Sequence, residues 1–201
     1  MKSALIGVLL WTQGATIGSS SLVGKQIPES ELLSPTGETF KLKPAFQGRP
    51  GVILFYPGGW DPYSVKLLKD FRNSISDLSS LRCHVIAVCP ELPSHIEKTL
   101  LEHDLPFVVL FDAGSLCAEE FGLNQKVTDE LLERKKKFGI NLQSRTGQIV
   151  VHLPKRALVW VKADASIAKI EDLSDSPQLR SGEDLISTAR WLLAKVENED
   201  S

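Results

Sequence analysis

The sequence predicts one α/β domain in which a mixed central sheet is flanked by helices, with an N-terminal β-hairpin and an insertion before the last hairpin. Three apolar runs, at residues 51–56, 83–89 and 107–111, are each long enough for a strand buried on both faces. Segments with the apolar spacing of amphipathic helices separate these runs. Such alternation is typical of right-handed crossovers and a largely parallel sheet.

The first half of the chain supplies most of these elements. Residues 31–42 have the pattern of a hairpin, with the Pro-Thr-Gly sequence at 35–37 as its turn. Helices are expected at 62–80, at 93–103 and, more briefly, at 114–121. The first of them carries one apolar stripe, formed by Leu68, Phe71, Ile75 and Leu78.

Residues 123–151 break the alternation, and we interpret them as an insertion. They contain a charged helix at 128–137 and a glycine-containing stretch after it. Two strands follow, at 157–162 and 166–170, and a turn at 164–165 makes them a second hairpin.

A final helix closes the domain. Ser181 is a suitable N-cap, and Asp184 stands at the third position after it. The residues expected to pack this helix on the sheet are Leu185, Ala189, Leu192 and Val196. The domain therefore extends over residues 22–198.

Residues 1–21 form an N-terminal extension. Lys2 precedes an apolar run at 4–11 and a small polar stretch, which resembles a short signal peptide. The alternative is a strand or helix that packs on the domain. The run is too short for a transmembrane helix. A cytoplasmic location is expected, with a secreted or organellar location as the alternative if the extension acts as a signal.

Composition excludes several classes of function. The chain has 23 Lys and Arg against 25 Asp and Glu, so it has no electrostatic signature for nucleic acid or a membrane surface. The basic run at 134–137 fits a solvated helix face. Cys83, Cys89 and Cys117 form neither a CxxC pair nor a metal-ligand pattern, which favours a reducing compartment and predicts no metal or other cofactor.

Residues 55–64, FYPGGWDPYS, resemble the active-site loop of the AhpC/TSA (redoxin) family of the thioredoxin superfamily. They are most similar to a peroxiredoxin-like subgroup with FYRGGWCPYC at this place. Residues 84–91, 107–122 and 156–167 resemble further family segments in the same order. The resemblance covers about residues 23–196 and implies a thioredoxin-like fold.

The same resemblance implies a changed active site. In the CPYC version both cysteines do redox work, and here Asp61 and Ser64 occupy their places. Against the peroxiredoxin pattern PxxxTxxC, Pro57 is kept and Ser64 stands at the peroxidatic cysteine. Arg156 stands where that family keeps an arginine that stabilises the thiolate.

The replacement of cysteine by serine removes the redox chemistry that this loop could otherwise carry out. A cysteine in the first turn of a helix becomes a thiolate near neutral pH, because free backbone N–H groups and the helix dipole lower its pKa. A serine hydroxyl needs a positioned base and forms neither a sulfenic acid nor a disulfide. We therefore expect a non-catalytic binding or regulatory protein.

Structural roles compete with catalytic ones for these residues. Asp61 before Pro62 is a favourable helix start, because aspartate accepts backbone N–H bonds as N-cap and proline suits the first helical position. Arg156 either binds an anion or forms an ion pair with Asp61. A hydrolase that uses Asp61, Ser64 and Arg156 is disfavoured because the sequence has no GxSxG elbow.

Cys89 supports the alternative function. It ends the second apolar run, so a residual thiol-dependent oxidoreductase or peroxidase would use this thiol, unless Cys89 is only a small buried apolar residue.

In the binding hypothesis, a groove floored by Trp60, Tyr63 and residues 153–154, with Pro57 and Arg156 beside it, takes a protein, a peptide or a small ligand. A homodimer is also compatible with the sequence.

Overall fold

A computed structural model describes residues 19–174 and 181–199 of the chain. Its central sheet has seven strands in the order β2-β1-β5-β4-β3-β8-β9. Parallel pairing joins β3, β4 and β5, and the other neighbours are antiparallel, so the predicted mixed sheet is confirmed. The strands are β1 (Glu31–Leu33), β2 (Thr39–Lys41), β3 (Gly51–Phe55), β4 (His84–Cys89), β5 (Val108–Phe111), β8 (Ala157–Val161) and β9 (Ile167–Asp172).

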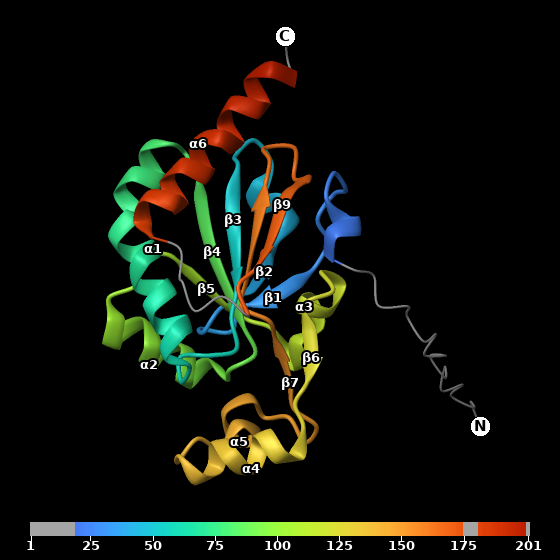
Figure 1. Cartoon of the computed structure of the whole chain (residues 1–201), viewed down its shortest axis with the longest axis vertical. Coiled ribbons are helices and arrows are strands. Elements are labelled where there is room, and N and C mark those ends of the chain that lie inside the picture. The colour runs from blue at the N-terminus through green and yellow to red at the C-terminus, as the bar shows by residue number, and fades with distance from the viewer. Residues whose placement is uncertain (1–18, 175–180, 200–201) are drawn as a thin grey trace, which may run out of the picture.

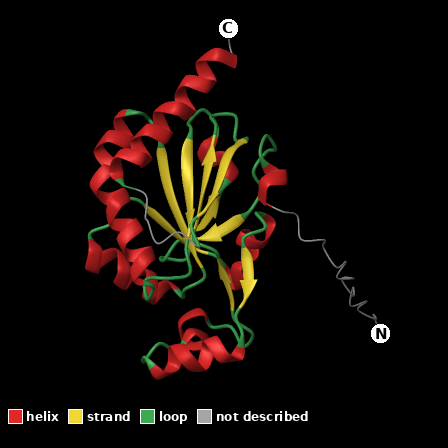
Figure 2. Ribbon diagram, in the orientation of Figure 1, coloured by secondary structure: helices red, strands yellow, loops and turns green. Residues whose placement is uncertain are grey.

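Helices cover both faces of this sheet. The long helices α1 (Pro62–Ser80), α2 (Pro93–His103) and α6 (Gly182–Glu199) lie together on one face, at the left of Figure 1. The short helices η1 (Ser19–Leu22), η2 (Lys43–Phe46), η3 (Ala113–Ser115) and α3 (Leu116–Glu120) complete the list for this part of the fold. Figure 2 shows the sheet between these helices.

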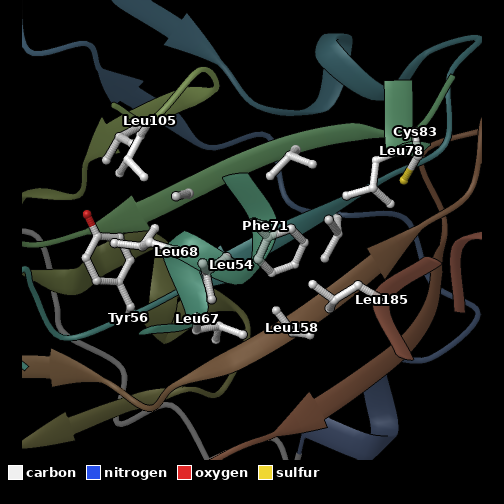
Figure 3. Packing of buried hydrophobic residues seen from close by; sticks show 14 of the residues in the cluster. Leu54, Tyr56, Leu67, Leu68, Phe71, Leu78, Cys83, Leu105, Leu158 and Leu185 are labelled. Atoms are coloured by element: carbon white, nitrogen blue, oxygen red, sulfur yellow. The ribbon is translucent and has the colours of Figure 1, made fainter. Parts of the chain in front are cut away.

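The alternation of side chains along β3 explains why both faces need a cover. Val52 and Leu54 belong to the apolar cluster under α1 and α6, whereas Ile53 and Phe55 belong to the cluster on the opposite face. Figure 3 shows Phe71 of α1 packed in the first cluster. Each fully buried side chain of this size stabilises the fold by about 2 kcal/mol.

The last helix, α6, begins and packs as predicted where the structure describes it. Ser181 caps α6, since its Oγ accepts the Asp184 N–H at 3.2 Å while Asp184 accepts the Ser181 N–H at 3.0 Å. Leu185, Ala189 and Leu192 are buried as expected. The expected signal segment and the side chain of Val196 lie outside what is described.

The expected helix at 114–121 is interrupted. Ser115 adopts a left-handed conformation with φ of 59°, which separates η3 from α3. The Asp112 carboxylate accepts the N–H groups of Cys117 and Ala118 at 2.9 and 3.0 Å and so caps α3. The hydrogen bonds from the Asp112 side chain thus fix a helix start at Leu116, although the apolar pattern predicted a helix from residue 114.

Residues 123–151 form more structure than expected. The charged helix is present as α4 (Asp129–Lys137), capped by Thr128, and α5 (Leu142–Thr146) follows it. Strands β6 (Asn124–Lys126) and β7 (His152–Pro154) pair as a separate two-stranded sheet. The α4–α5 segment extends beyond the end of the central sheet, at the bottom of Figure 1.

Within the described residues, no helix combines the length and the apolar character that a membrane crossing needs.

Candidate functional site

Two glycines shape the loop that joins β3 to α1. Gly58 has a φ of 146°, and a Cβ there would lie 2.6 Å from Cδ of Glu91. A Cβ on Gly59 would overlap the Thr99 hydroxyl of α2. Only glycine fits at these two positions, because the loop backbone passes close to Glu91, which follows β4, and to Thr99 of α2.

Asp61 starts α1 as predicted. Its Oδ2 accepts the backbone N–H of Ser64 at 3.0 Å and the Ser64 hydroxyl at 2.6 Å, and Pro62 fills the first helical position. Ser64 is fully buried, so its hydroxyl donates to the cap and does not face solvent. This contact between hydroxyl and carboxylate is the one arrangement in the loop that resembles a nucleophile with its base.

Arg156 forms the predicted ion pair with Asp61. Its Nη1 lies 3.0 Å from Asp61 Oδ2, and the two side chains are only 14% and 9% exposed. Its Nη2 donates to the backbone carbonyls of Leu173 and Ser174 at 3.4 and 3.2 Å. The guanidinium also lies over the Tyr63 ring, 5.1 Å from its centroid. The positive charge of Arg156 therefore has a protein partner.

A second ion pair, between the buried Glu91 and the partly exposed Arg145, contacts the loop at Gly59. Glu91 is fully buried and accepts the Gly59 N–H at 2.6 Å together with Nε–H of Arg145. The Arg145 carbonyl accepts the Leu92 N–H at 2.8 Å. Arg145 belongs to α5, so these contacts tie the α4–α5 segment to the loop.

Sequence reasoning did not single out Glu91 or Arg145. Glu91 carries a usable signal, because it follows a strand at the carboxyl edge of the sheet, where functional side chains of α/β folds gather. Arg145 carries none, since it lies in a stretch for which no helix was expected.

Trp60 is half-buried, and its expected place in the floor of a binding groove stays a prediction. Its ring packs against the apolar cluster of the α4–α5 segment, and the Lys135 ammonium lies 4.5 Å from the ring centroid. The added helices thus cover this side chain. Tyr63 remains 49% exposed beside Arg156.

A pocket of about 220 Å³ lies next to the loop. It includes Pro57, Arg156 and residues 153–154 as expected, but neither Trp60 nor Tyr63. The other lining residues are apolar, cationic or uncharged polar. They are Val127, Leu131, Lys126, Lys155, Gln125 and Ser174.

Cys89 ends β4 and is fully buried. Burial, and next the charge of Glu91, raise the pKa of its thiol to about 12. Burial also raises the pKa of Cys83 to about 12 and that of Cys117 well above its ordinary value. None of the three cysteines forms a disulfide.

These thiols should be unreactive in the folded chain, because attack requires an accessible thiolate. A chromogenic aromatic disulfide at pH 8 is expected to titrate no thiol rapidly in native protein and all three in guanidinium chloride. Rapid reaction of one native thiol, lost in Cys89→Ser, would contradict the buried state of Cys89.

Within residues 19–174 and 181–199, no group of three or more His, Cys, Asp or Glu side chains is placed to hold a metal ion.

Comparison with known proteins agrees with this architecture. The chain is 32% identical to peroxiredoxin Bcp of Bacillus subtilis over 117 residues, which is 58% of this chain and 69% of that protein. It is 29% identical to a chloroplastic peroxiredoxin Q of Populus jackii over 100 residues, half of this chain and 46% of the relative.

Solved structures share the fold at low identity. The peroxidoxin BcpB of Mycobacterium tuberculosis superposes with a TM-score of 0.65 at 18% identity, over 85% of this chain and 97% of that one. A peroxiredoxin 6 of Arenicola marina gives 0.69 at 16% identity, over 87% and 74%. The sequence model of the AhpC/TSA family matches residues 23–169. The chain therefore belongs to the AhpC/TSA family and has its peroxiredoxin-like, thioredoxin-type fold.

Proposed function

We propose that this chain is a peroxiredoxin-like protein that works by binding rather than by redox chemistry at its active-site loop. The observation that carries the proposal is the closed network of Asp61, Ser64 and Arg156 at the start of α1. Its ligand, a protein, a peptide or a small molecule, would occupy the pocket beside Pro57 and Arg156.

The network supports a structural role because the hydroxyl, the carboxylate and the guanidinium each have a partner within it. The Ser64 hydroxyl donates to Asp61, and Asp61 is paired with Arg156. A nucleophile at Ser64 would also have to reach its substrate from a fully buried position. Hydrolysis at this loop therefore has little support, and serine cannot reduce a peroxide.

The competing function is a peroxidase or another thiol-dependent oxidoreductase that uses Cys89. The names of the relatives motivate it. The full burial of Cys89 and the raised pKa of its thiol argue against it. A cytoplasmic location and a homodimer stay predictions from the sequence.

Thiol-dependent consumption of hydrogen peroxide tests the proposal directly. The parent chain is expected to show no turnover above the rate without protein. An Asp61→Cys, Ser64→Cys variant and an Asp61→Thr, Ser64→Cys variant should gain activity, because each returns a thiol to the first turn of α1.

Both variants also lose the Asp61 carboxylate, so their folding must be verified by circular dichroism before their rates are compared. The parent chain with Cys89→Ser serves as the matched control. Peroxide turnover by the parent, abolished in that control, would overturn the proposal in favour of Cys89.

A further inference from the structure

A second pocket lies at the opposite end of the sheet from the Asp61 loop. It has a volume of about 360 Å³, and its lining residues are Gly48, Arg49, Ser79, Arg82, Cys83 and His84. β3 begins there, with Gly51 paired to His84, and α1 ends there at Ser80. The 19 residues of α1 span about 28 Å, so the two pockets are separate sites.

Among the described residues, the charges that line this pocket are all of one sign, since no Asp or Glu of this part of the chain lines it. Nη1 of Arg49 lies 3.0 Å from Nε2 of His84. Burial, and next the charge of Arg49, lower the pKa of His84, which keeps the ring neutral and able to accept this hydrogen bond. The ring is also hydrogen-bonded to the backbone of Ala45. Arg49 is thus held in place by a neutral group.

Neither guanidinium is neutralised. Among the described residues, no carboxylate lies within ion-pair distance of Arg49 or Arg82, whereas Arg145 and Arg156 each pair with one. The last turn of α1 does not compensate them either. Its carbonyls at Asp77, Leu78 and Ser79 accept the N–H groups of residues 81–83.

Arg82 occupies a strained position. Its φ is 53°, and it directly follows the C-cap Leu81 of α1, a position where glycine or asparagine is the usual choice. Strained residues of this kind gather at functional sites. Arg82 lines the pocket although its backbone conformation is unfavourable for a residue other than glycine, which favours a functional role for its side chain.

We infer that this pocket binds the phosphate group of a small phosphorylated molecule. The planar guanidinium matches phosphate oxygens in a bidentate way, and two arginines with a serine hydroxyl form a suitable donor set. The volume equals about twelve waters at roughly 30 Å³ each, which is more than a phosphate ion needs. The inference is independent of what the loop at Asp61 does.

Titration calorimetry of the full chain at pH 7.5 and low ionic strength tests this site. Glycerol 3-phosphate is the probe, with inorganic phosphate and glycerol as comparisons. We expect binding of glycerol 3-phosphate and none of glycerol. Equal binding of inorganic phosphate would assign the same site to the free ion, and absence of binding by both phosphates would overturn the inference.

Variants separate binding from folding. Arg82→Gly removes the guanidinium and also relieves the positive φ, so it should weaken phosphate binding at least tenfold while it raises the melting temperature. Arg49→Gln should weaken binding by a similar factor. Arg134→Gln, at an exposed position of α4, is the control and should bind like the parent. Unchanged affinity in both Arg49→Gln and Arg82→Gly would contradict the site.

Discussion

Replacement of Arg145 by alanine is expected to lower the free energy of unfolding by about 3–5 kcal/mol, because it leaves the fully buried carboxylate of Glu91 without its cationic partner. The Gly59 N–H would then be its remaining partner among the contacts described. Urea denaturation followed by circular dichroism measures the loss.

Two variants show whether charge burial is the cause. Arg145→Lys keeps the charge but loses the guanidinium geometry, so its loss should be smaller. Lys98→Ala breaks an exposed pair with Glu102 and should cost less than about 1 kcal/mol. If Arg145→Ala is no more destabilising than Lys98→Ala, the pair does not hold the α4–α5 segment to the loop.

Asp61→Ala should have an effect of similar size, about 4 kcal/mol. It removes an N-cap, worth about 0.5–2 kcal/mol, and it leaves the mostly buried guanidinium of Arg156 unpaired, at about 3–5 kcal/mol. The two contributions share one carboxylate, so they should not add fully. Urea denaturation again gives the measurement.

Asp61→Asn separates the contributions, because asparagine still caps a helix but carries no charge. It should lose only the part that comes from the ion pair. Asp70→Ala, on the same helix and paired with the exposed Lys66, is the control, with an expected loss below about 1 kcal/mol. Equal losses at positions 61 and 70 would show that the buried pair adds nothing to stability.

The strands and long helices could be predicted because each carries its signal locally. β3 and β4 are continuous apolar runs, and α1 combines an apolar stripe with Asp61 and Pro62 at its start. β6 could not be predicted, because its three polar residues, Asn124 to Lys126, show neither an apolar run nor alternation.

Contacts between residues far apart in the sequence could likewise be predicted only where the sequence carries a signal for both partners. Asp61 and Arg156 are 95 residues apart, and their pairing was foreseen only because the family resemblance brings both to one site. Glu91 and Arg145 are 54 residues apart, and no motif connected them. The packing of Trp60 against the α4–α5 segment was not foreseen for the same reason, since that segment carries the least sequence signal.

The anchoring of the loop on both sides has a consequence for local opening. The start of α1 is joined through Asp61 to Arg156, the residue before β8, and the glycines before α1 are joined to α5 through Glu91 and Arg145. The first turn of this helix therefore cannot unwind without separating the Asp61–Arg156 pair. The glycines before it cannot move away without breaking the hydrogen bond from the Gly59 N–H to the buried Glu91 carboxylate. Such a segment belongs to the slowly exchanging part of a protein rather than to its low-energy fluctuations, so any partner at this end meets a preformed surface.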